Sequence, residues 1–193
     1  MRNESKVREV ERRLRDVVNR SAIQDRLMLN KRGWEQLCAS MDVIGDTDLA
    51  VEAFLNSPVG ERDYGLLYLH AYGLLQALFV QQDAVEHAAE AIGVPYTPDA
   101  ALATIRNVRN DIVGHPTKRG RRPESFGIVR ISLSTEEFRM FSFDLSRPNN
   151  FQSVRFRELI DAQRVAVVAA IEQMISHLQS WPGASEAEPD PAT

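Results

Sequence analysis

One segment, residues 63–92, constrains the fold more than any other part of this chain. It contains no proline, and its apolar side chains cover most faces of a helix until polar residues begin after Gln81. Its most apolar part, residues 64–80, is interrupted by His70 and Gln76 and is shorter than the roughly 20 residues that a membrane span needs. The segment therefore predicts a helix that other elements must cover, the central helix of a buried core.

Helical periodicity also appears on both sides of this segment. We expect further helices over residues 7–17, 21–41, 46–56, 97–113 and about 152–179, with Thr97 as the N-cap of the fourth. Residues 128–133 and 138–145 instead alternate apolar with polar side chains, which predicts a two-stranded hairpin. The predicted fold is an all-α antiparallel helical bundle, with a small β-hairpin between the last two long helices.

The composition bounds the organisation and the partners. A chain of 193 residues with 44% hydrophobic side chains suits one domain with additions. We expect N-terminal helices over residues 1–60, a bundle over 61–181 with the hairpin at about 126–145, and a disordered acidic tail over 182–193. The single Cys38 and a residue 1–20 segment without an apolar signal core indicate the cytoplasm. The net charge of -4 means that any nucleic-acid binding must use a local patch, and no membrane partner is expected.

Residues 109–115, Arg-Asn-Asp-Ile-Val-Gly-His, place an arginine and a histidine where a helix should end. The series Leu102, Ile105, Arg109, Ile112 follows 3-4-3 spacing, so Arg109 falls on or beside the apolar stripe of its helix. Burying a guanidinium there is costly unless a partner meets it. Gly114 breaks the helix and allows His115 to fold back toward the arginine.

This pair has the chemistry of metal-free RNA cleavage. A histidine can take a proton from a ribose 2′-hydroxyl or give one to a leaving 5′-oxygen, and a guanidinium can stabilise the charge of the transition state. The loop that follows contains four cations that could bind the phosphates of a single strand: Lys118, Arg119, Arg121 and Arg122. We expect neither a metal nor another cofactor.

The motif Arg109, Asn110, then His115 resembles that of the HEPN superfamily, whose fold is a helical bundle. The resemblance covers residues 63–179 at most, and the N-terminal helices and the hairpin fall outside the minimal bundle. It implies that Arg109 and His115 are catalytic, that Asn110 orients them, and that two copies of the motif form the site across a homodimer. It also implies a metal-independent endoribonuclease of a toxin-antitoxin, abortive-infection or RNA-processing system, with an antitoxin or neighbouring regulator as a possible partner. Thr117 stands where toxins paired with nucleotidyltransferase antitoxins have a tyrosine.

Other interpretations of the same residues remain open. Arg109 could tie down the helix end against a carboxylate such as Asp111, and His115 could be a helix cap. The chain would then be a non-catalytic helical module that binds a protein partner or a nucleotide. Tyr64, Tyr68 and Tyr72 repeat every four residues and suggest an interface, whereas His70 suggests a core histidine. An Arg109–His115 pair in a cleft favours catalysis, and Arg109 bridged to a carboxylate favours the structural interpretation.

Overall fold

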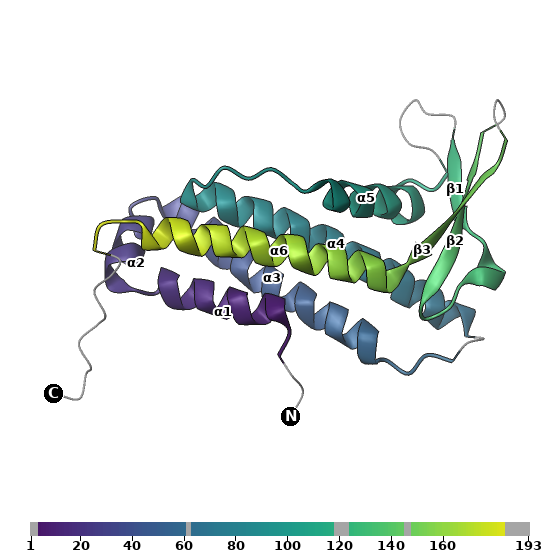
Figure 1. Ribbon diagram of the computed structural model, residues 1–193, viewed down its shortest axis with the longest axis horizontal. Coiled ribbons are helices and arrows are strands. Elements are labelled where there is room, and N and C mark those ends of the chain that lie inside the picture. Colours follow the sequence, from purple (N-terminus) through teal and green to yellow (C-terminus); the bar gives the residue numbers. More distant parts are fainter. Residues whose placement is uncertain (1–3, 61–62, 118–123, 145–147, 184–193) are drawn as a thin grey trace. The chain divides into compact units, whose positions relative to one another are not determined.

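A computed structural model describes residues 4–60, 63–117, 124–144 and 148–183 of the chain, and within these ranges it is mostly helical with one small sheet (Figure 1). The α-helices are α1 (Lys6–Val18), α2 (Ser21–Met28), α3 (Lys31–Asn56), α4 (Tyr64–Ile92), α5 (Ala100–Arg109) and α6 (Phe156–Gln179). The strands are β1 (Ser125–Ile128), β2 (Glu137–Phe143) and β3 (Asn150–Arg155). The prediction of a mainly helical fold with a small antiparallel β insert is confirmed.

The chain divides into two compact units, and both draw on α3, α4 and α6. Unit 1 comprises Met1–Asp48, Gln81–Thr97 and Arg164–Thr193, and unit 2 comprises Leu49–Val80 and Pro98–Gln163. The domain boundaries that the sequence suggested, at about residues 60 and 181, remain predictions. The candidate motif and the whole sheet belong to unit 2.

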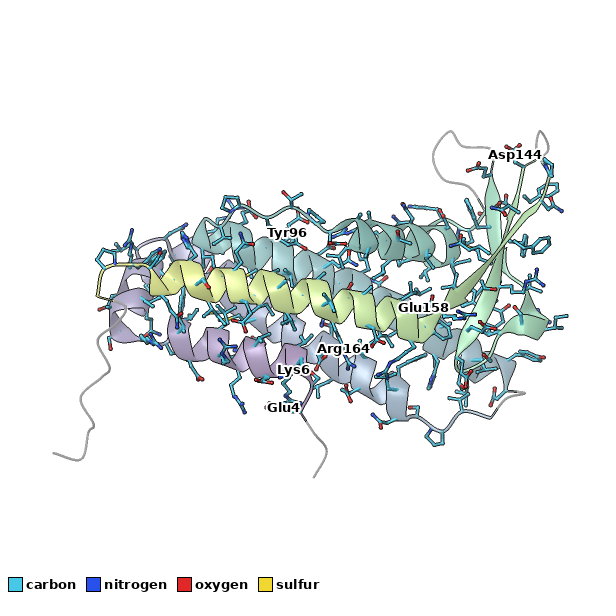
Figure 2. All side chains as sticks on the ribbon, in the orientation of Figure 1. Glu4, Lys6, Tyr96, Asp144, Glu158 and Arg164 are labelled. Atoms are coloured by element: carbon cyan, nitrogen blue, oxygen red, sulfur yellow. The ribbon has the colours of Figure 1, made fainter. Side chains whose placement is uncertain are left out.

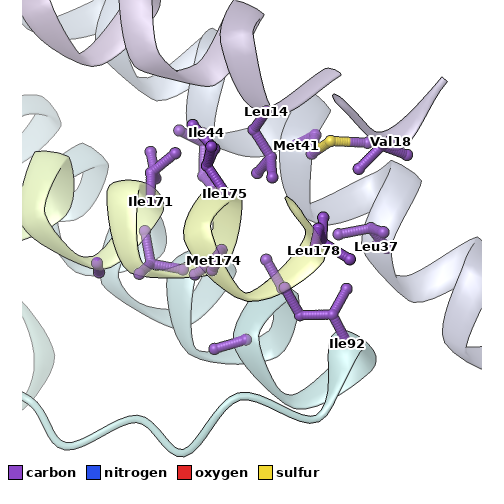
Figure 3. Packing of buried hydrophobic residues seen from close by; sticks show 14 of the residues in the cluster. Leu14, Val18, Leu37, Met41, Ile44, Ile92, Ile171, Met174, Ile175 and Leu178 are labelled. Carbon is purple, nitrogen blue, oxygen red and sulfur yellow. The ribbon is translucent and has the colours of Figure 1, made fainter. Parts of the chain in front are cut away.

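The core of unit 1 is a continuous apolar cluster, part of which Figure 3 shows at close range. The seam predicted for the first helix is buried, with Leu14 fully inaccessible to solvent. It packs with residues of α3 and α6, among them Ile44 and Ile175. Burial of this kind stabilises a fold by about 1.5–3 kcal/mol for each large apolar side chain.

The helix boundaries of unit 1 differ from the sequence prediction at two places. α3 continues through residues 42–45, where a break between two helices was expected. Within the continuous helix the Thr47 hydroxyl donates back to the carbonyls of Val43 (2.6 Å) and Ile44 (3.1 Å). The break lies instead at Leu29 and Asn30, where Asn30 Oδ1 accepts from Gly33 N at 3.1 Å.

In unit 2 the predicted hairpin is a three-stranded antiparallel sheet in the order β1-β2-β3. β1 ends at Ile128, and a short 3-10 helix over Arg130–Ser132 replaces the expected end of the first strand. Ser132 Oγ holds this turn, because it donates to Val129 O at 2.7 Å and accepts from Arg139 N at 2.8 Å. The predicted strand over residues 128–133 is therefore wrong in its position.

The third strand occupies residues in which the final helix was expected to begin. Val154 lies opposite Phe138 in the β2–β3 register, and both side chains are buried. α6 starts only at Phe156, whose ring packs 5.5 Å from that of Phe138. At this junction Arg155 Nη1 donates to Glu158 at 2.9 Å. Glu158, which is labelled in Figure 2, lies on the first turn of α6. Pairing with a distant strand thus outweighs the local helical pattern at residues 150–155.

Candidate functional site

The helix that carries the motif begins two residues later than predicted and buries the predicted stripe. Asp99 is the N-cap of α5, since its Oδ1 accepts from Ala101 N at 2.7 Å, so the assignment of Thr97 to this role is wrong. The apolar positions expected to face the core are at most 4% exposed: Leu102, Ile105, Val108 and Ile112. α5 is therefore fixed in rotation, with Arg109 half-buried at its last position.

A π-helix over Asn110–Gly114 follows α5 directly and replaces the last α-helical turn that the sequence predicts. The His115 N–H donates to Asn110 O at 2.7 Å, five residues back, which is the hydrogen bond of a π-helix. His115 then leaves the helix with φ -144° and ψ 54°, and its side chain is exposed. Short π-helical segments are rare and occur frequently at functional sites.

Gly114 serves a different purpose from the left-handed helix stop that its sequence position suggests. Its φ is not positive, so any residue could adopt its backbone conformation. A Cβ at this position would lie only 2.9 Å from Arg109 Nη1. Glycine is therefore needed here to leave space for the guanidinium.

The Arg109 guanidinium has a set of neutral partners within unit 2. Gln76 Oε1, on α4, accepts from Arg109 Nε at 3.0 Å and from Nη2 at 2.8 Å, and Asn110 Oδ1 accepts from Nη1 at 3.0 Å. A guanidinium carries five N–H groups, so these bonds leave two without a partner among the described residues. The carboxylate that the structural interpretation requires is not among these partners.

An aromatic ring lies beside this guanidinium. Arg109 Cζ lies 4.3 Å from the centroid of the Phe79 ring, and Arg106 Cζ lies 4.8 Å from the same centroid. Gln76 and Phe79 are three residues apart on α4, as Arg106 and Arg109 are on α5, so the two helices present matching faces. The partners of Arg109 among the described residues are two amide oxygens and this ring, so an anion would stabilise its positive charge.

His115 lies next to this position in the chain but not in hydrogen-bond contact with it. Among the described residues, no side chain bonds the imidazole of His115. The backbone beyond it is held to β1, because Phe126 N donates to Pro116 O at 2.6 Å and Ser125 Oγ donates to Thr117 O at 3.0 Å. Arg109 and Asn110 are thus brought together, whereas the His115 ring is left open to solvent or to a partner.

Sequence reasoning missed three residues of this arrangement: Gln76, Phe79 and Arg106. The available signal was Gln76 itself, a polar residue within the most apolar helix. His70 is half-exposed instead of buried in the core, and its ring centroid lies 6.0 Å from that of Phe54. Both line a groove of about 320 Å³ between residues of α3 and α4 in unit 2. The predicted substrate-binding residues lie outside the described ranges: Lys118, Arg119, Arg121 and Arg122.

The described residues contain neither a cluster of metal ligands nor a membrane-spanning helix. No group of three or more His, Cys, Asp or Glu side chains is arranged to hold a metal ion there. None of the helices described is long and apolar enough to cross a membrane.

Comparison with known proteins gives no relative from which a role could be transferred. No family model, no curated protein and no solved structure matches the chain. Any functional assignment therefore rests on the residues and the geometry described above.

Proposed function

We propose that the protein is a metal-independent endoribonuclease with a HEPN-like helical bundle, acting in the cytoplasm in a defence, toxin-antitoxin or RNA-processing role. The observation that supports this most is Arg109, whose guanidinium contacts Gln76, Asn110 and Phe79 and has two N–H groups without a partner in the described part of the chain. It stands at the start of a π-helix that ends at the exposed His115.

In the proposed reaction His115 takes the proton of a ribose 2′-hydroxyl. The 2′-oxygen attacks the adjacent phosphorus, and the bond to the 5′-oxygen breaks as that oxygen receives a proton from an imidazolium. The products are a 2′,3′-cyclic phosphate and a free 5′-hydroxyl. Arg109 stabilises the charge that develops on the phosphoryl oxygens, and Asn110 holds the guanidinium in place.

The complete site of this proposal contains two copies of the motif across a homodimer. One His115 then acts as the base and the other as the acid, which the exposure of the ring and its lack of a described intramolecular partner support. The basic residues Lys118, Arg119, Arg121 and Arg122 bind the phosphates of the RNA on either side of the cleaved bond. An antitoxin or neighbouring regulatory protein is a further proposed partner.

The test is a cleavage assay with purified dimer and labelled RNA in the presence of a chelator. We expect His115→Ala to abolish cleavage and Arg109→Lys to reduce it, because lysine keeps the charge but lacks the planar fork. His87→Ala is the matched control, since His87 is an exposed histidine on α4 in unit 1. Absence of cleavage by the wild-type dimer, or full activity of His115→Ala, would remove the basis of the proposal.

The alternative is a non-catalytic helical module that binds a protein partner or a nucleotide. The observation in its favour is the apolar groove of unit 2, whose lining includes Leu69 of α4, a side chain that is 66% exposed. On this alternative Arg109→Ala lowers the stability, His115→Ala changes neither stability nor binding, and the wild type cleaves no RNA.

A further inference from the structure

The outer face of the sheet carries exposed aromatic side chains. Along β2 the side chains alternate, with Phe138 and Met140 buried on the inner face. On the outer face Phe143 of β2 is 45% exposed and Phe151 of β3 is 52% exposed. Large apolar side chains grouped on one exposed face are unusual for a surface without a binding role.

The strand register arranges these rings in adjacent rows. Phe141 lies opposite Gly127 on one side and opposite Phe151 on the other. The Phe141 ring packs against Gly127, because a Cβ at that position would lie 2.6 Å from two ring atoms. Phe143 follows two residues along β2, about 7 Å away on the same face. Gly127 therefore gives the Phe141 ring room to lie over β1, and the Phe151 ring belongs to β3, on the other side of β2.

One cation on this face has no carboxylate partner in the described chain. Arg139 Cζ lies 5.3 Å from the centroid of the Phe151 ring, and this is the side-chain interaction that the structure gives it. Arg155, on the same face, is instead paired with Glu158 (2.9 Å) and Glu137 (3.3 Å), which raise its pKa. Arg139 is thus the cation beside the rings that is available to a phosphate.

We propose that this outer face, defined by Phe141, Phe143, Phe151 and Arg139, stacks the bases of a single-stranded nucleic acid. Every base has a π-face that can stack on an aromatic ring, and a guanidinium beside the ring can bind the phosphate that follows. An uncharged apolar partner and an acidic peptide fit this face less well, because rings beside a cation that has no carboxylate partner among the described residues match the alternation of base and phosphate. RNA is the nucleic acid that the proposed cleavage would favour.

The position of the sheet in unit 2 connects this face with the candidate site. β1 packs beside the π-helix, and its Phe126 N–H binds the carbonyl of Pro116, the residue after His115. A nucleic-acid strand bound to the sheet would therefore lie near the motif. Binding at this face does not require cleavage, so the proposal goes beyond the nuclease function and can be tested without it.

The test measures binding of a short single-stranded oligonucleotide of mixed sequence, as RNA and as DNA, by fluorescence anisotropy. The full-length His115→Ala protein is used so that RNA stays intact. We expect Phe151→Ala and Phe143→Ala each to weaken binding by about 5- to 150-fold, the effect of losing one stacked base. Phe151→Leu should be as weak as Phe151→Ala because it keeps the apolar bulk without the π-face, whereas Phe151→Tyr should bind normally.

Two further variants sharpen the result. Val165→Ala truncates a side chain that is 74% exposed on α6 in unit 1 and should leave binding unchanged. Arg139→Gln should reduce the slope of log K against log salt concentration by about 0.7, the value for one phosphate contact on a single strand.

Each outcome decides the proposal. Binding of either oligonucleotide that depends on the rings as described supports it. No binding, equal binding by Phe151→Leu and wild type, or a change of oligomeric state in place of a change in binding would overturn it, the last because the face would then join two copies of the chain. If the wild type cleaves no RNA but binding still depends on the rings, this proposal is supported and the proposed nuclease function is contradicted.

Discussion

Replacing Gln76 by glutamate separates a catalytic role of Arg109 from a structural one. Gln76 Oε1 accepts two hydrogen bonds from Arg109, at 3.0 and 2.8 Å, and both side chains are half-buried. Gln76→Glu places a carboxylate at nearly the same position. The two bonds become fully charge-assisted, and the positive charge of Arg109 is neutralised inside the protein.

The expected effects of Gln76→Glu on stability and on activity have opposite signs. A half-exposed ion pair contributes about 0–1 kcal/mol, so the free energy of unfolding should stay constant or rise by that amount, with the Tm up by at most about 4 °C. Removing a stabiliser of transition-state charge costs about 10²- to 10³-fold in kcat, so cleavage should fall by that factor. The matched variant Gln76→Leu loses the acceptor and should lower the stability by about 1–2 kcal/mol.

The assay combines thermal unfolding with RNA cleavage under saturating substrate. If Gln76→Glu cleaves RNA as fast as the wild type with an equal or higher Tm, the charge of Arg109 is not used and the reasoning is refuted. A large fall in Tm for Gln76→Glu would instead contradict the contact between Gln76 and Arg109.

Four other predictions follow from single contacts. Gly114→Ala should displace the Arg109 guanidinium and reduce cleavage by up to about 10²-fold with little change in Tm, since the atom that clashes is the end of a flexible side chain. Asp99→Ala should lower the unfolding free energy by about 1 kcal/mol in urea titrations through loss of the cap of α5. Phe138→Ala, at a fully buried position, should lower it by about 3–5 kcal/mol, and an effect below 1 kcal/mol would show that the sheet is not packed as described. Burial, followed by a nearby carboxylate, raises the pKa of Cys38, so its alkylation near pH 8 should be slower than that of a small free thiol and should accelerate as the pH rises.

The amphipathic parts of the fold could be predicted from the sequence because their signal is local. The seam around Leu14 and the stripe around Ile105 follow helical spacing, and both are buried. The helix end near Gly114 was also predicted at the right place, although the glycine leaves space for the Arg109 guanidinium and does not adopt a positive φ. Periodicity shows which face of an element is apolar, and the hydrophobic effect favours burial of that face whatever packs against it.

The remainder of the fold depended on pairings between distant residues. β3 forms through pairing with β2, in which Val154 lies opposite Phe138. The local sequence around residue 152 does not indicate this pairing, so a helix was predicted to start there. In the continuous α3 the Thr47 hydroxyl bonds the preceding turn, whereas the sequence leaves open whether a threonine caps a helix or bonds back within one.

For the candidate site, the sequence by itself determined that an arginine and a histidine flank a helix end and that the arginine lies beside an apolar stripe. Only the tertiary structure decided the partner of Arg109, because Gln76 reaches it from another helix and no local pattern encodes that contact. The π-helix likewise lies beyond local prediction, since one extra residue in a turn changes hydrogen bonds without changing the apolar spacing that the sequence displays.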